Sequence, residues 1–116
     1  MQSIKEILKE KTILLEGFDP IAAQGFTQVP NLVLKNPALS AGAKLAYALL
    51  LSYAWNNSNC FPGQKRMSED CGMSQGWVSL QMKELEEEGF LIIQRRGQGK
   101  TNIYTLKYKV KQEKRS

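Results

Sequence analysis

A glycine-containing turn between two helical patterns constrains this chain more than any other feature. It lies within residues 61–90, where a predicted helix over residues 64–71 is followed by Gly72. Glycine ends a helix readily because it adopts a positive φ without steric cost. Ser74 can then accept an unpaired backbone N–H group at the start of the next helix. A helix, a short turn and a capped helix together predict a helix-turn-helix.

The second predicted helix, residues 74–88, has one apolar face. Val78, Met82 and Leu85 recur at helical spacing and predict the side that packs on the core. At about 100° per residue, the opposite face consists of four residues: Gly76, Ser79, Leu80 and Lys83. Gln75 stands at the start of the helix, the end at which recognition helices usually meet base edges.

The segments on either side of this motif predict a winged domain. Residues 40–55 form a predicted helix that is apolar nearly all round, with Lys44 as its only charge. Such a helix is expected at the centre of the core or under a partner subunit. Residues 90–96 predict a strand by their β-branched content, residues 97–100 a turn, and residues 101–108 a returning strand. A hairpin directly after a helix-turn-helix is a wing.

The expected fold class is therefore α+β and mainly α, a winged helix-turn-helix with a three-helix core, a hairpin wing and an N-terminal arm. We expect residues 1–24 to be the arm, residues 25–108 the domain and residues 109–116 a basic tail. The arm contains apolar positions that predict a short amphipathic helix able to dimerise: Ile4, Ile7, Leu8, Leu14 and Leu15.

The charge of the chain favours a polyanionic partner. The net charge is +5, and it is concentrated at one end. Residues 89–116 carry eight Lys and Arg against Glu113 alone, a net +7, whereas residues 1–25 have a net −1. Basic side chains that neutralise phosphates release counterions, which drives binding to nucleic acid. For the tail at residues 109–116, a solubilising role is an equal alternative.

The residues expected to contact DNA come from the second helix, the wing and two further helices. Gln75 can bond adenine with two hydrogen bonds, Ser79 can bond several base edges, and Gly76 allows a close approach of the backbone. Leu80 fits a thymine methyl group or a partner subunit equally well. The expected backbone contacts are all cations: Lys83 on the second helix, Arg95, Arg96 and Lys100 on the wing, and Lys65, Arg66 and Lys44 elsewhere. We expect the wing to supply much of the affinity.

Four glutamates and one tryptophan on the second helix have other expected roles. The acidic run lies at the far end of the helix and is interpreted as a solvated face: Glu84, Glu86, Glu87 and Glu88. Because it would repel phosphate, only the N-terminal end of the helix is expected to enter a groove. Trp77 is expected to pack against the first helix of the motif, with phosphate contact through its indole N–H as the alternative.

The sequence contains no recognisable set of catalytic or metal-binding residues. The chain has no histidine and two cysteines, Cys60 and Cys71, which is too few ligands for a zinc site. Nucleophilic or general-base catalysis has no obvious machinery, so we expect no enzyme activity and no cofactor. With neither a signal peptide nor a membrane-spanning run evident, a cytoplasmic location is expected.

At the level of families, the chain resembles the winged helix-turn-helix domains of phage and plasmid replication proteins. The matching residues are 39–45, 61–64, 71–74, Val78, 83–91 and the basic hairpin. Residues 29–34 are similar to the lead-in of DnaD-type replication-initiation proteins, in which the N-terminal segment helps self-association. Gly76 and Trp77 stand where such domains often carry a basic residue and a threonine.

These observations predict a double-stranded DNA-binding protein, expected to be a homodimer, with helix 74–88 in the major groove and wing 94–101 on the backbone or minor groove. The resemblance implies a role in replication initiation or in transcriptional regulation of a phage or plasmid, with other replication proteins as a further class of partner. The competing hypothesis is a winged-helix protein-docking module without direct base readout.

Overall fold

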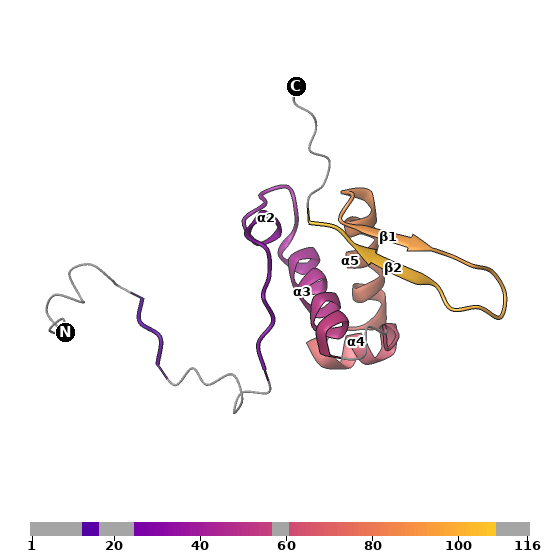
Figure 1. Ribbon diagram of the computed structural model, residues 1–116, viewed down its shortest axis with the longest axis horizontal. Coiled ribbons are helices and arrows are strands. Elements are labelled where there is room, and N and C mark those ends of the chain that lie inside the picture. Colours follow the sequence, from indigo (N-terminus) through magenta and orange to yellow (C-terminus); the bar gives the residue numbers. More distant parts are fainter. Residues whose placement is uncertain (1–12, 17–24, 57–60, 109–116) are drawn as a thin grey trace, which may run out of the picture.

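The computed structural model describes residues 13–16, 25–56 and 61–108 of the chain. Within these residues, four helices precede an antiparallel hairpin (Figure 1): α2 (Asn31–Leu34), α3 (Ala41–Asn56), α4 (Gln64–Cys71), α5 (Gln75–Glu87), β1 (Leu91–Gln94) and β2 (Ile103–Leu106). This arrangement confirms the expected winged helix-turn-helix, because the hairpin directly follows the second helix of the motif.

The turn between α4 and α5 is built by local backbone contacts. Gly72 ends α4 with a φ of 72°, and its N–H donates to the Glu69 carbonyl at 3.3 Å. The Met73 N–H returns to the Ser68 carbonyl at 3.0 Å, so two of the last carbonyls of α4 are satisfied. Ser74 caps α5, since its hydroxyl oxygen accepts the Trp77 N–H at 3.0 Å. Both predicted capping roles are confirmed.

The core lies where α5 packs against α3 and α4. The stripe predicted on the second helix is confirmed, because Val78, Met82 and Leu85 are all buried. Around them lie the other buried apolar side chains of the described chain: Val33, Leu39, Ala43, Ala46, Tyr47, Leu50, Tyr53, Met67, Phe90 and Leu91. A single connected core of this kind is what one small domain can form.

Helix α3 is buried on one face only. Leu45 and Trp55 point outward and are 45% and 51% exposed. The expectation of a central buried helix therefore holds for its inner face, whereas Leu45 and Trp55 on its outer side are left exposed by the residues that the structure describes. The helix approaches α5 closely at Gly42, where an added Cβ would lie 2.5 Å from Gln81 Oε1 and 3.0 Å from Trp77 Cζ2. Trp77 thus packs against α3, whereas the sequence analysis assigned it to the first helix of the motif.

The wing begins at the C-terminal end of α5. Gly89 adopts a φ of 85°, and the Phe90 N–H donates to the Leu85 carbonyl at 2.9 Å, which turns the chain out of the helix. The Phe90 ring then meets Tyr47 of α3 edge-on, with 6.1 Å between ring centroids. The strands pair antiparallel, from Leu91 opposite Leu106 to Gln94 opposite Ile103.

Both strands are shorter than the sequence predicted. The ladder ends at Gln94, and residues 95–102 form a loop around Gly97 and Gly99, whose φ angles are 94° and 77°. The Lys100 N–H closes a turn onto the Gly97 carbonyl at 3.2 Å.

The arm is described only at residues 13–16. These residues form no helix, and the side chains of Ile13, Leu14 and Leu15 are mostly exposed. The remainder of the predicted amphipathic stripe, in residues 1–12, lies outside the described residues. Of the helices that the structure describes, none has the length and apolar content to cross a membrane.

Candidate nucleic-acid interface

The N-terminal half of α5 presents an exposed surface without acidic residues. It consists of four exposed residues that were predicted there from the sequence: Gln75, Gly76, Ser79 and Leu80. Lys83, predicted for the same interface, is also exposed but lies in the C-terminal half of the helix. Leu80 is 65% exposed, an unusual fraction for a large apolar side chain on a helix that forms the core. This surface follows the capped turn directly, so its position is set by the same contacts that begin the helix.

Glu84 lies about one turn beyond Leu80 on α5 and is not part of a solvated face. Its Oε2 accepts the Ser40 backbone N–H at 2.8 Å, and its Oε1 accepts the Ser40 hydroxyl at 2.7 Å. The Ser40 oxygen also accepts the Ala43 N–H at 3.1 Å and so caps α3. These donated hydrogen bonds lower the pKa of Glu84. The carboxylate joins the start of α3 to α5, which corrects the interpretation of the acidic run.

The rest of the acidic run divides in two. Glu87 and Glu88 are exposed, as a solvated face requires. Glu86 forms an ion pair with Arg95 of the wing, with 3.5 Å between its Oε2 and Nη1. The run therefore contributes two anchors and two exposed charges, and all of it lies away from the capped end of α5.

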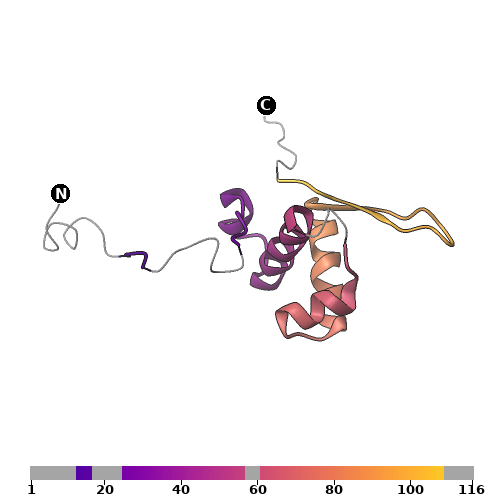
Figure 2. The same ribbon diagram turned by 60° about the horizontal axis from the view of Figure 1, so that its bottom comes forward.

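The wing cations differ in how they are held. The Arg96 Nε donates to the Thr101 carbonyl at 2.8 Å, and its Nη2 donates to the Thr101 hydroxyl at 3.2 Å. This pair spans the base of the wing loop and fixes Arg96 on the hairpin itself. Arg95 is paired with Glu86 and is still 63% exposed, and Lys100 is exposed near the tip. The wing reaches beyond the helices in both views (Figures 1 and 2).

A groove of about 670 Å³ joins the wing to the start of α4. Lys100 and Asn102 of the wing loop line one side of it, and Gln64 lines another. Its apolar part includes Phe61 and Tyr104, whose ring centroids are 4.5 Å apart. Lys100 therefore lies on the side of the wing that faces α4, where two further predicted cations follow Gln64.

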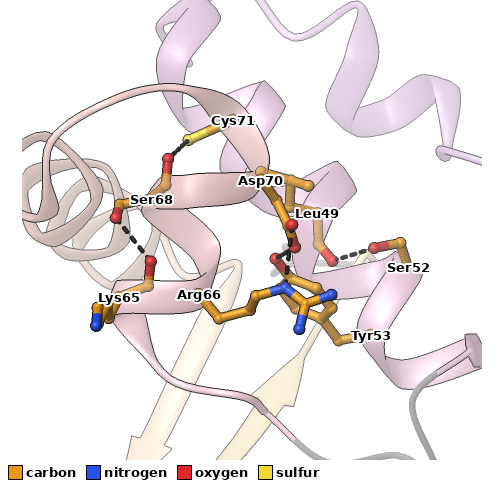
Figure 3. A network of polar contacts seen from close by, with 8 residues as sticks. All are labelled: Leu49, Ser52, Tyr53, Lys65, Arg66, Ser68, Asp70 and Cys71. Atoms are coloured by element: carbon orange, nitrogen blue, oxygen red, sulfur yellow. Dashed lines mark hydrogen bonds and ion pairs between the residues drawn. The ribbon is translucent and has the colours of Figure 1, made fainter.

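These two cations, Lys65 and Arg66, are exposed on the first turn of α4. Arg66 Nε donates to Asp70 Oδ1 at 3.1 Å, and Asp70 Oδ2 accepts the Tyr53 hydroxyl at 2.6 Å (Figure 3). The Tyr53 hydrogen bond, aided by Arg66, lowers the pKa of Asp70. Lys44 lies apart from this group, half-buried on α3.

Comparison with known proteins agrees with this geometry. A family model described as "Helix-turn-helix domain" matches residues 38–91. The match spans less than half of the chain and agrees with the helix-turn-helix fold formed by α4 and α5. A solved structure described as "N-Terminal domain of DNA binding protein" is similar, with 23% identity and a TM-score of 0.56 over 92% of this chain and 82% of that chain. At this identity the likeness shows a shared fold. Comparison with curated proteins gave no significant match.

The matched helix-turn-helix domain ends at the first residue of β1, so the wing and its cations lie beyond it. The resemblance to DnaD-type, phage and plasmid proteins stays a prediction. The sequence did not predict a role for Tyr53 or Asp70, and it did not predict that Glu86 pairs with Arg95. The spacing of Arg66 and Asp70 by four residues was a signal for their ion pair. Tyr53 and Glu86 had no such signal, because their partners come from other elements.

Proposed function

We propose that this protein binds double-stranded DNA through α5 and the wing. The observation that carries the proposal is the exposed, acid-free N-terminal surface of α5. In helix-turn-helix proteins this end of the second helix enters the major groove. The match of residues 38–91 to a helix-turn-helix domain supports the proposal, and so does the description of the structural neighbour as part of a DNA-binding protein.

In this proposal Gln75 and Ser79 read base edges, and Gly76 lets the helix approach the groove floor. Exposed Leu80 contacts a thymine methyl group. The wing cations bind phosphates or enter a minor groove, and Lys83 adds a backbone contact. Glu84 and Glu86 stay outside the groove because they contact Ser40 and Arg95. Glu87 and Glu88 stay outside it because they lie at the far, C-terminal end of the helix.

The proposal also includes the biological process in which the protein acts. Replication initiation or transcriptional regulation of a phage or plasmid rests on the family resemblance of the short motifs. Other replication proteins are then the expected partners. We further propose a binding function without catalysis or cofactor. Its support is chemical, since the sequence has no histidine to serve as a general base near neutral pH.

Self-association is supported by the outer face of α3. Leu45 and Trp55 leave an apolar surface on the side of α3 away from its buried residues, and Ile13 and Leu15 of the arm are 83% and 72% exposed. Uncovered apolar surfaces of this kind mark contacts with other chains. The same observation favours the second candidate function, a protein-docking module. Sedimentation velocity on the full chain distinguishes a homodimer from a monomer, and a monomer would favour the protein-docking function.

Fluorescence anisotropy with a random duplex of about 30 base pairs tests the DNA proposal. Binding is expected to weaken as salt rises, with a log-log slope of about 0.9 per neutralised phosphate and several phosphates contacted. Selection from a random library then finds the preferred site. Absence of binding at low salt would overturn the proposal in favour of protein docking.

A further inference from the structure

Arg66 is held side-on, in a way that leaves the end of its guanidinium group available. Only Nε contacts Asp70, at 3.1 Å, and the side chain is 62% exposed. Among the described residues, neither Nη nitrogen has a hydrogen-bond partner. The two Nη nitrogens form a planar fork that matches two oxygens of a phosphate or carboxylate. In Figure 3 this end of the guanidinium group points away from Asp70.

Asp70 is in turn held from the core. Tyr53 belongs to the buried cluster on α3, and its hydroxyl donates to Asp70 Oδ2 at 2.6 Å. Each carboxylate oxygen thus has a different donor: Tyr53 on one side and Arg66 on the other (Figure 3). Burial raises the pKa of Tyr53, and the hydrogen bond to Asp70 raises it further, so the hydroxyl keeps its proton.

This linkage differs from an ordinary surface ion pair. An exposed pair four residues apart on a helix is loosely held, because both side chains are flexible and solvated. Here one partner is fixed by a rigid aromatic ring in the core. Tyr53 restricts the conformations of the Asp70 side chain, and Asp70 in turn restricts those of Arg66. The arginine therefore loses less conformational freedom when it binds an anion.

We propose that Asp70 and Tyr53 are positioning residues that hold Arg66 for a two-point contact with a DNA backbone phosphate. The contact is placed where the first helix of the motif crosses the backbone. The inference rests on the proposed DNA binding. It has an unusual consequence: an acidic side chain near the phosphate raises affinity, because its effect on the geometry of Arg66 exceeds its repulsion.

The test is the affinity of the full chain for a random 30-base-pair duplex, measured by anisotropy at several salt concentrations. Asp70→Ala is expected to weaken binding about threefold to tenfold and to lower the salt slope by about one contact, although it removes a negative charge. Arg66→Ala is expected to do the same. The matched control is Glu69→Ala, which removes the same charge from the neighbouring position of α4 and is expected to leave affinity equal or slightly higher.

Two further variants separate positioning from loss of fold. Tyr53→Phe keeps the ring and removes the hydroxyl, so a smaller loss of affinity is expected, with the helical circular dichroism spectrum and melting temperature recorded for each variant. In an Arg66→Ala background, Asp70→Ala is expected to cause no further loss, because there is no arginine left to position. A structural effect of Asp70 would lower affinity in both backgrounds and would overturn the proposal.

The remaining outcomes are equally decisive. If Asp70→Ala binds as tightly as Glu69→Ala while the wild type binds DNA, the positioning role is wrong and the proposed function stands. If the wild type binds no duplex at low salt, the proposed function fails and the positioning role fails with it.

Discussion

The two ends of α5 are held in different ways. At its N-terminal end, Gly72 and Ser74 build the turn from hydrogen bonds that span at most five residues. At its C-terminal half, Glu84 binds Ser40, which is 44 residues away, and Glu86 binds Arg95 of the wing. The locally built end carries the exposed surface proposed to meet DNA, whereas the other end carries the anchors. A recognition surface can therefore change its side chains without disturbing the contacts that hold the helix in place.

Substitutions in the wing, beyond the anchored end of α5, are expected to cause the largest loss of DNA affinity. Arg95→Ala with Arg96→Ala should weaken binding to every duplex by about 10- to 100-fold and flatten its salt dependence by about two contacts. The measurement is anisotropy across a salt series, with Lys107→Ala as a control that removes a charge from the base of the wing. An unchanged affinity and slope in the double variant would exclude the wing from the interface.

The capped, N-terminal end of α5 is expected to determine how well the protein distinguishes its preferred DNA sequence from other sequences. Gln75→Ala or Ser79→Ala should lose about tenfold in the ratio of affinities for a selected site and a random duplex, within the range of about 1–3 kcal/mol for a base contact. Binding of both duplexes is measured at the same salt concentration. Equal losses on the two duplexes would mean that these side chains do not read bases.

The stability of the capped end depends on one hydroxyl. Ser74→Ala removes the acceptor for the Trp77 N–H, and we expect the free energy of unfolding to fall by about 1 kcal/mol. Urea denaturation measures it. Ser79→Ala is the matched control, because the same substitution at an exposed position inside α5 removes no cap. A loss of similar size in the control would show that the cap contributes little.

The contact between Glu84 and Ser40 at the anchored end of α5 is expected to add a small, pH-dependent contribution to the free energy of unfolding. Ser40 lowers the pKa of Glu84, so the stabilisation is present above the ordinary pKa of glutamate and is lost as pH falls through the lowered value. Glu84→Gln should therefore cost up to about 1 kcal/mol near pH 7 and less in acid. Unfolding of both proteins is compared between pH 7 and pH 3, with exposed Glu87→Gln as control. A difference that does not change with pH would contradict the role of Glu84.

The sequence predicted the fold better than the contacts of the candidate interface. The bounds of α4, the caps at Gly72 and Ser74 and the buried stripe at Val78, Met82 and Leu85 are confirmed, and α5 was predicted one residue too long at each end. The strands of the wing were predicted too long at both ends, since the ladder pairs only Leu91–Gln94 with Ile103–Leu106. Whether the named cations contact DNA stays a prediction.

What the sequence determined by itself is the helix-turn-helix, since caps, turns and apolar periodicity act over a few residues and can be recognised in any segment of chain. What only the tertiary structure decided is which charged groups are already engaged. Glu84 contacts Ser40 at the start of α3, Asp70 accepts the hydroxyl of Tyr53 on α3, and Arg95 pairs with Glu86 across the junction of α5 and the wing. Packing brings such residues together at distances that spacing along the chain does not contain, so Glu84 and Glu86 contact Ser40 and Arg95 although both were predicted to lie on a solvated face.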